Sequence, residues 1–142
     1  MTITFRIATA QDIDFCFTLT KENMKESFEK YWGGFSDTAC RKHISIDSTR
    51  LIYLDGKLVG YFALTLCDAY WCLDNIQLRS EFCGHGIGTG VLSHVFSIVR
   101  ESDCSRVHLT VFKDNAALKL YERNGFVVLS EKNNALLMEK VF

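Results

Sequence analysis

Apolar and polar residues alternate with two different periods along this chain, and each change of period marks a new element. Alternation with a period of two predicts a half-buried strand over residues 2–8. Apolar residues then recur every three to four positions over residues 13–31, as in an amphipathic helix. Thr9 and Asp12 precede this helix with the spacing of a capping box. The chain is therefore predicted to begin with a strand and a long helix.

The middle of the chain has the pattern of a short helix and three strands. Residues 37–46 are predicted to be helical, with Asp37 as the N-terminal cap. Asp55 and Gly56 are a strong hairpin signal between two alternating segments. Three consecutive antiparallel strands are expected here, over residues 50–54, 58–66 and 70–78.

The remaining segments complete an α+β pattern. After a glycine-rich stretch and its helix, we expect a strand, a helix closed by Gly125 and Phe126, and two final strands. They cover residues 106–112, 115–124, 126–129 and 135–141. The order β-α-α-β-β-β-α-β-α-β-β predicts a mixed, mostly antiparallel central sheet of about seven strands with about four helices. No repeat or linker interrupts it, so we expect a single domain over residues 1–142.

The glycine-rich stretch is the most informative part of the sequence. Gly84, Gly86, Gly88 and Gly90 occupy alternate positions between a strand pattern and a helix pattern. A backbone without Cβ atoms can approach an anion closely, and the following helix N-terminus adds partial positive charge. The stretch therefore predicts a loop that binds phosphate.

Two common phosphate-binding loops do not fit this stretch. A P-loop requires a glycine followed by Lys and then Ser or Thr, whereas Gly56 and Lys57 are followed by Leu58. The dinucleotide-binding fingerprint G-x-G-x-x-G requires a third glycine where this chain has Thr89, Val91 or Ser93.

The stretch resembles the signature of the GCN5-related N-acetyltransferase (GNAT) superfamily, R/Q-x-x-G-x-G/A. That motif falls between the fourth strand and the next helix, and here it reads Cys83-Gly84-His85-Gly86-Ile87-Gly88. A second segment, from Asn115 through Tyr121 to Gly125 and Phe126, is similar to the family's N-x-x-A-x-x-x-Y-x-x-x-G-F, shifted only at the alanine. The predicted order of elements also matches that family along essentially the whole chain.

The resemblance implies acetyl-CoA as the cofactor and direct acetyl transfer to an amine as the reaction. The main chain of the strand before the loop is then expected to pair with the pantetheine arm, and the loop to bind the diphosphate. The positions implied in cofactor binding are Ile76, Gln77, Leu78, Cys83, Gly84, His85, Gly86, Ile87, Gly88, Thr89, Asn115 and Tyr121.

This chain departs from the family pattern in two places. Cys83 occupies the position usually filled by Arg or Gln, and Ser80 stands where proline is common. The loop is therefore expected to rely on main-chain donors, with Arg79 and His85 as nearby sources of positive charge.

The resemblance also implies catalytic roles, each with a structural alternative. Tyr121 matches the tyrosine proposed to protonate the thiolate, and the alternative is an aromatic packing residue. Asp74 is the best candidate for a general base, and the alternative is a carboxylate at the sheet edge. Asn115 is expected either near the cofactor arm or as a plain helix cap.

The acceptor site is expected at the two early helices and their aromatic corner. Glu22, Glu26, Tyr31 and Trp32 are candidates to bind a cationic amine through charge and aromatic faces, and the alternative is a solvated helix face beside a packed corner. His43, His94 and His108 lie on ordinary helix or strand patterns, and no pair has metal-ligand spacing, so no metal site is expected.

The composition of the chain limits the classes of partner that we expect for it. A net charge of −1 gives no basic excess for nucleic acid, and no apolar run approaches the length of a membrane span. The N-terminus is too polar for a signal peptide, and the six cysteines are widely spaced, which favours buried free thiols in the cytoplasm over disulfides. We expect a cytoplasmic N-acetyltransferase, monomeric or homodimeric, that acts on a small-molecule or peptide amine. The alternative is a non-catalytic acyl-CoA-binding sensor of the same fold.

Overall fold

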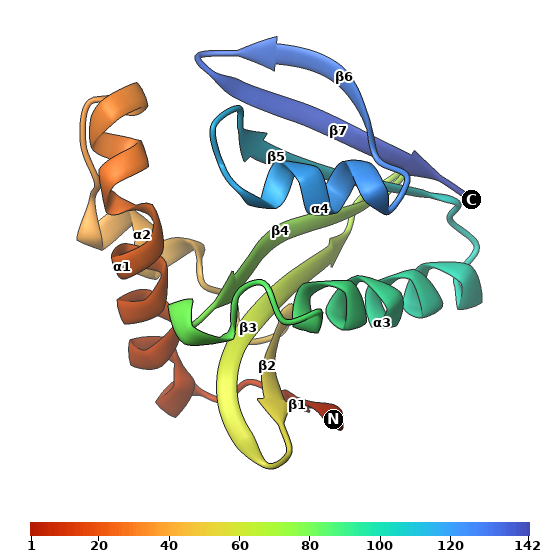
Figure 1. Cartoon of the computed structure of the whole chain (residues 1–142), viewed down its shortest axis with the longest axis horizontal. Coiled ribbons are helices and arrows are strands. Elements are labelled where there is room, and N and C mark those ends of the chain that lie inside the picture. The colour runs from red at the N-terminus through yellow and green to blue at the C-terminus, as the bar shows by residue number, and fades with distance from the viewer. The chain divides into compact units, whose positions relative to one another are not determined.

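All of the predicted helices and strands are present in the computed structural model, which describes residues 1–142 (Figure 1). The strands are β1 (Ile3–Ile7), β2 (Thr49–Leu54), β3 (Lys57–Leu66), β4 (Trp71–Leu78), β5 (Arg106–Phe112), β6 (Val127–Lys132) and β7 (Ala135–Val141). The α-helices are α1 (Ile13–Trp32), α2 (Asp37–His43), α3 (Ile87–Glu101) and α4 (Ala117–Arg123), with short 3₁₀ helices η1 (Ala10–Asp12) and η2 (Ser80–Phe82). The predicted order of elements and the α+β class are confirmed.

The strands form one seven-stranded sheet in the order β1-β2-β3-β4-β5-β7-β6. β1 pairs antiparallel with β2, β2 with β3, β5 with β7, and β6 with β7. β4 and β5 are parallel, and their register pairs are Trp71 with Val107 and Cys72 with His108. The mostly antiparallel sheet with one βαβ unit, β4-α3-β5, is therefore confirmed.

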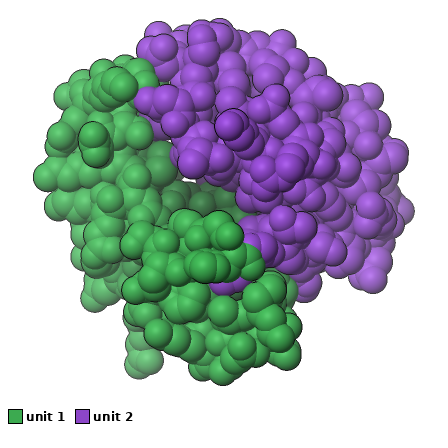
Figure 2. Space-filling view, in the orientation of Figure 1, with its two compact units in different colours: residues 1–63, 75–85 green, residues 64–74, 86–142 purple.

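The chain divides into two compact units, which Figure 2 shows in different colours. Unit 1 consists of Met1–Ala63 and Asn75–His85, and unit 2 of Leu64–Asp74 and Gly86–Phe142. The chain passes from one unit to the other within β3, within β4 and inside the glycine-rich stretch. The single domain expected from the sequence stays a prediction.

The core of unit 1 joins α1 to β2 and β3. Cys16 and Leu19 of α1 pack in one buried cluster with Leu51 and Tyr61 of the two strands. The Thr20 hydroxyl donates to the Cys16 carbonyl oxygen at 2.7 Å and also hydrogen-bonds to the Tyr61 hydroxyl, so the buried polar groups of this helix are paired. The buried residues of α1 are Cys16, Phe17, Leu19 and Thr20, and of the predicted apolar stripe (Ile13, Phe17, Met24, Phe28 and Tyr31) only Phe17 is buried.

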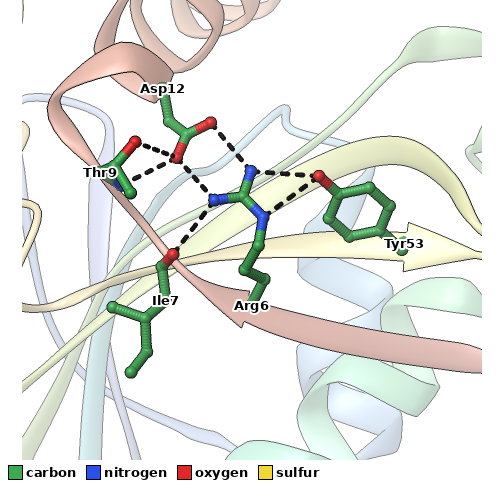
Figure 3. A network of polar contacts seen from close by, with 5 residues as sticks. All are labelled: Arg6, Ile7, Thr9, Asp12 and Tyr53. Carbon is green, nitrogen blue, oxygen red and sulfur yellow. Dashed lines mark hydrogen bonds and ion pairs between the residues drawn. The ribbon is translucent and has the colours of Figure 1, made fainter.

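A polar network fixes the start of α1 to the first two strands (Figure 3). The Arg6 guanidinium donates to both Asp12 carboxylate oxygens at 3.0 Å and to the Tyr53 hydroxyl at 3.1 Å. Asp12 also accepts from the Thr9 main-chain N–H at 2.8 Å, as expected for the predicted capping box. Chiefly because of the hydrogen bonds from Arg6, the pKa of Asp12 lies below its usual value of 3.8.

Replacing Asp12 with asparagine is expected to remove part of the acid sensitivity of folding. A carboxyl group whose pKa is lower in the folded chain stabilises the fold above its unfolded pKa, and this stabilisation is lost as the pH falls through the folded pKa. Measured by denaturant unfolding from pH 6 to pH 2, the free energy of unfolding of wild type should therefore fall more steeply below about pH 4 than that of Asp12→Asn. Equal slopes for the two proteins would contradict this role.

One predicted helix cap is wrong. Asp37 is the first residue of α2, and the cap is Ser36, whose hydroxyl oxygen accepts from the Ala39 N–H at 3.1 Å. Ser36 has the extended backbone that a cap needs, and Asp37 instead forms an ion pair with Lys21 at 3.0 Å. The helix also ends at His43 rather than residue 46, because Ile44 is already extended.

The core of unit 2 is built around α3, whose buried face continues the predicted apolar stripe. Its buried residues are Ile87, Val91, Leu92, Val95, Phe96 and Val99. A Cβ atom on Gly88 would lie 2.8 Å from the Leu120 side chain, so this glycine allows Leu120 of α4 to lie against α3. Gly88 therefore has a packing role in addition to its place in the loop.

The end of α4 confirms the predicted glycine cap. Gly125 has a φ of +94°, its N–H donates to the Glu122 carbonyl oxygen, and the Phe126 N–H donates to the Tyr121 carbonyl oxygen, both at 3.1 Å. These are the two bonds of a Schellman motif, and the Tyr121 and Phe126 rings make its hydrophobic contact at 5.8 Å. Lys140 of β7 adds a cation, which donates to the Asn124 carbonyl oxygen at 2.8 Å.

The cysteines are all free, as predicted, but their burial differs from the prediction. Cys16 alone is fully buried, Cys83 is exposed, and the other four are intermediate. The four lie near strand ends and short helices, where an apolar pattern does not ensure a deep position. None of the helices has the length and apolar character required to cross a membrane.

Candidate functional site

The glycine-rich loop follows η2 and is held open by two glycines in left-handed conformation. Gly84 and Gly86 have φ values of +79° and +81°, which L-residues with a Cβ rarely adopt. A Cβ atom at either position would meet no atom within 4 Å. The glycines therefore serve the backbone conformation, and the space beside them is open to a ligand.

The first turn of α3 has no acceptor for its main-chain N–H groups. Gly86 is the N-cap and provides no side chain, and the first main-chain bond runs from the Gly90 N–H to the Gly86 carbonyl oxygen at 3.2 Å. The N–H groups of residues 87–89 precede this bond, and the first turn contains no acidic residue. Ile87 itself is fully buried, so its side chain anchors the turn while its N–H remains a donor. The turn is suited to an anion.

Cys83 is a neutral thiol at the start of this loop. Partial burial raises its pKa, and its thiol lies 3.8 Å from the Arg79 carbonyl oxygen. The Arg79 guanidinium lies over the Phe15 ring at 5.6 Å, whereas His85 is exposed. Main-chain N–H groups are thus the principal donors of the loop, with His85 as the exposed basic side chain.

The Gln77 side chain, predicted as a cofactor contact, is occupied within unit 1. It is 9% exposed, its oxygen accepts from Asn23 Nδ2 at 3.0 Å, and its nitrogen donates to Asn75 Oδ1 at 2.8 Å. Asn23 Nδ2 also donates to the Leu78 carbonyl oxygen at 3.0 Å. Sequence reasoning missed Asn23, because an asparagine on the polar side of a helix gives no sign of a contact with a strand 54 residues away.

The second half of β4 lies against β3 within unit 1. β3 approaches so closely that a Cβ atom on Gly60 would lie 2.2 Å from the Gln77 carbonyl oxygen. Toward β5, β4 is paired in register at Trp71 and Cys72.

Asp74 is an exposed carboxylate held in a small polar cluster. The Thr65 hydroxyl donates to Asp74 Oδ2 at 2.6 Å. Burial, and then the Asp74 carboxylate, raises the pKa of the Cys72 thiol to about 12. The arrangement fixes an anion on unit 2 beside a thiol that stays protonated.

Tyr121 combines a buried ring with an unpaired hydroxyl. The residue is 5% exposed, and burial raises its pKa well above the usual range. Its hydroxyl makes no hydrogen bond within the chain, yet no buried side-chain nitrogen or oxygen atom lacks a partner. The hydroxyl oxygen must therefore lie at accessible surface, where it stays protonated and can donate to a ligand.

Asn115 lies one residue before the N-cap of α4, which is Ala116. Its Oδ1 accepts from the Ala117 N–H at 2.8 Å. The helix begins at Ala117 rather than at residue 115, because Asn115 uses its side chain in place of a helical bond.

The predicted acceptor residues lie on unit 1. A shallow hollow runs along α1 and is lined by Thr18, Lys21, Glu22, Lys25, Glu26 and Glu29. Trp32 is 49% exposed, and its ring lies 5.0 Å from that of Phe28. Lys30 lies over the Tyr31 ring at 4.9 Å. Glu22 and Glu26 therefore share one open face of α1, while Tyr31 and Trp32 belong to the aromatic corner at its end.

The predicted site residues are distributed over both units. Asp74, Tyr121, Asn115 and the first turn of α3 belong to unit 2. The second half of β4, the start of the loop and the acceptor residues belong to unit 1.

Known proteins are similar to this chain in sequence and in fold. YobR of Bacillus subtilis (strain 168), named an uncharacterized N-acetyltransferase, is 32% identical over 81 residues, which is 56% of this chain and 33% of that protein. The match thus spans about a third of that relative's length. PaiA N-acetyltransferase from Thermoplasma acidophilum, solved in complex with coenzyme A, has a TM-score of 0.78 at 19% identity, and both chains are covered completely.

Arabidopsis thaliana Naa50, solved with the bisubstrate analogue CoA-Ac-MVNAL, has a TM-score of 0.76 at 18% identity, again with full coverage of both chains. These two structures show that the fold is shared. The model of the acetyltransferase (GNAT) family matches residues 7–126, which include the sheet from β2 to β5, the glycine loop and α4. The chain therefore belongs to the acetyltransferase (GNAT) family.

Proposed function

We propose that this chain is an acetyl-CoA-dependent N-acetyltransferase that transfers an acetyl group directly to a primary amine of a small molecule or a peptide. The observation that carries the proposal is the Tyr121 hydroxyl, which is protonated, accessible and free of any partner in the chain. A module that only bound a cofactor would have no need of a proton donor in this state. Family membership and the phosphate-binding geometry of the loop support the same function.

The residues of the loop fit the diphosphate of CoA. The N–H groups of residues 87–89 have no helical acceptor, and the left-handed Gly84 and Gly86 leave open space beside them. The main chain of Ile76 and Leu78 is our candidate for the pantetheine arm, although the Leu78 carbonyl oxygen already accepts from Asn23. When bound, acetyl-CoA supplies an activated acyl group and a thiolate leaving group.

Tyr121 and Asp74 are the two residues to which we assign proton chemistry. Because burial raises its pKa, the Tyr121 phenol holds its proton at Oη through neutral pH and serves as the general acid toward the leaving sulfur. Asp74, held by Thr65, is the carboxylate that attracts the ammonium form of the acceptor and assists its deprotonation.

The open face of α1 is our candidate for the acceptor. Glu22 and Glu26 are exposed on one helix face, as an attractive surface for a cationic amine requires. The exposed Trp32 adds an aromatic face at the end of the same helix. The complex of Naa50 with the bisubstrate analogue CoA-Ac-MVNAL supports a peptide as one acceptor class.

The second candidate is a non-catalytic acyl-CoA-binding sensor of the same fold. Cys83 favours it, since this residue replaces a side chain that usually assists the diphosphate and adds no charge of its own. The two candidates differ in turnover rather than in cofactor binding.

The deciding experiment measures CoA thiol release from acetyl-CoA with a panel of amines. The panel should contain polyamines, aromatic ethylamines, amino acid amides and short peptides with free N-termini. We expect turnover with at least one class, together with thermal stabilisation of the protein by CoA. Stabilisation by CoA without turnover on any amine would reject the enzyme and leave the sensor.

A further inference from the structure

A histidine and a glutamate of unit 2 form a nearly buried pair outside the residues considered so far. His108 of β5 lies opposite Glu139 of β7 in register, and its Nε2 is 2.8 Å from Glu139 Oε2. Arg106 donates to the other carboxylate oxygen at 3.0 Å. The side chains of His108 and Glu139 are only 15% and 12% exposed. The Tyr70 ring stacks on the imidazole with 4.0 Å between ring centres and 15° between planes, which fixes the ring orientation.

The charge of Glu139 determines which histidine nitrogen carries the proton. The hydrogen bond with His108, and then that with Arg106, lowers the pKa of Glu139, so this group is a carboxylate at neutral pH and accepts only. His108 Nε2 must therefore be the N–H donor, and Nδ1 of the neutral ring has a free lone pair. Nδ1 makes no hydrogen bond within the chain, and since no buried side-chain nitrogen lacks a partner, Nδ1 reaches accessible surface.

The position of His108 connects it to Asp74. His108 is the register partner of Cys72 on the neighbouring strand β4. Residues paired in register on neighbouring strands point to the same face, so His108 and Cys72 are neighbours on one face of the sheet. Asp74 lies two residues further along β4, on the same face as Cys72, and its carboxylate accepts from Thr65 and raises the pKa of the Cys72 thiol. A continuous row of polar side chains thus crosses unit 2 and consists of Thr65, Asp74, Cys72, His108 and Glu139.

We propose that His108 is the general base that takes the proton of the acceptor ammonium. The proposal rests on the proposed N-acetyltransferase function. One N–H bond of the ammonium breaks, its electron pair stays on the amine nitrogen, and a new N–H bond forms at His108 Nδ1. The neutral amine then attacks the acetyl carbonyl carbon, and the C–S bond breaks with its electrons on sulfur, which takes a proton from Tyr121. The new amide nitrogen gives up its second proton, which returns through water to the Tyr121 phenolate. The positive ring faces Glu139 and afterwards returns its proton to water.

The division of work between His108 and Asp74 follows from their chemistry. Asp74 is an exposed anion that attracts a cation, whereas imidazole is the side chain that ordinarily changes charge between pH 5 and 8. Glu139 stabilises the charged ring as it forms, in the way a carboxylate orients and supports a catalytic histidine. Glu139 is therefore a positioning residue, and His108 is the catalytic one.

The test replaces His108 with glutamine, whose amide keeps a donor for Glu139 but offers no basic lone pair. With the most active amine of the panel, we expect kcat/KM at pH 7 to fall by about 100-fold, the usual contribution of a general base. The affinity for CoA should be unchanged, and His43→Gln, an exposed histidine of α2, is the control for the loss of a histidine.

The pH profile separates a base from a structural role. The acidic limb of kcat/KM in wild type should be lost in His108→Gln. Glu139→Gln should shift the limb to lower pH, because the carboxylate that stabilises the charged ring is removed. The other titratable groups near the ring are Tyr70, which stacks on it, Arg106, which is paired with Glu139, and Cys72, its register partner, with Asp74 close to Cys72. The fall in kcat/KM caused by His108→Gln should also be smaller with an aromatic amine, because such an amine is already neutral at pH 7 and needs no base to remove a proton.

A measurement without substrate tests the tautomer itself. In ¹⁵N NMR spectra of the substrate-free protein at pH 7.5, the imidazole signals of His108 are identified as those that disappear in His108→Gln. We expect their chemical shifts to be those of an unprotonated Nδ1 and a protonated Nε2. A protonated Nδ1, or a His108→Gln rate within a factor of about three of wild type, would overturn the role of His108 alone. Absence of turnover by wild type with every amine would overturn the proposed function, and this proposal with it.

Discussion

Replacing Tyr121 with phenylalanine is expected to lower kcat for acetyl transfer by about 100- to 1,000-fold and to leave the affinity for CoA unchanged. The substitution removes one oxygen atom, and this oxygen is the proton donor proposed for the leaving sulfur. Because the hydroxyl makes no hydrogen bond within the chain, its loss leaves no unpaired group behind. The free energy of unfolding should therefore change by less than about 0.5 kcal/mol. Steady-state kinetics, calorimetric titration with CoA and denaturant unfolding measure the three quantities.

Tyr61 provides a matched control for this experiment. It is also a buried tyrosine whose pKa is raised by burial, but its hydroxyl hydrogen-bonds to Thr20 in unit 1. Tyr61→Phe should cost about 1 kcal/mol of stability, because the Thr20 hydroxyl loses a partner, and should leave kcat unaltered. If the two substitutions lowered kcat equally, the hydroxyl of Tyr121 would have no special role.

Replacing Gly86 with valine is expected to weaken CoA binding by about 100-fold. The added side chain would stand in the open space beside the first turn of α3 and keep an anion from the N–H groups there. Loss of two hydrogen bonds to a charged group corresponds to about 3 kcal/mol, which gives that change in Kd. Calorimetric titration with CoA measures the change directly.

Gly56 provides a control that distinguishes two effects of Gly86→Val, the loss of the CoA-binding site and the strain of the backbone. Its φ of +84° is almost that of Gly86, and a Cβ atom there would also meet nothing within 4 Å. It lies in the hairpin turn between β2 and β3. Gly56→Val should therefore lower the melting temperature about as much as Gly86→Val and leave the Kd for CoA unchanged. Normal CoA binding by Gly86→Val would remove the loop from the site.

Local signals in the sequence were sufficient to predict most of the fold. The Asp55-Gly56 turn, the capping box at Thr9 and the closing of α4 by Gly125 and Phe126 each depend on a few neighbouring residues, and each is present. Such features can be predicted because the backbone conformation they require is available to few residue types. The choice between Ser36 and Asp37 failed, since both residues are good caps and only the backbone conformation distinguishes them.

The parts of the site that depend on contacts between distant segments could not be predicted. Gln77 is adjacent to predicted cofactor contacts, yet its side chain is bound by Asn23 from another element. His108 follows an ordinary strand pattern, and only the register of β5 with β7 places Glu139 beside it. Register is set by the whole sheet rather than by neighbouring residues, so pairs of this kind become visible only in three dimensions.

The division of the chain into units has a consequence for its cooperativity. Neither unit is a continuous piece of sequence, because β3 and β4 each give one part to unit 1 and the other part to unit 2. No single cut in the chain yields an intact unit, and the unfolding of either one releases strand segments that continue into the other. No smaller part of the chain is therefore expected to unfold independently on heating, and the two units are expected to unfold in one all-or-none transition.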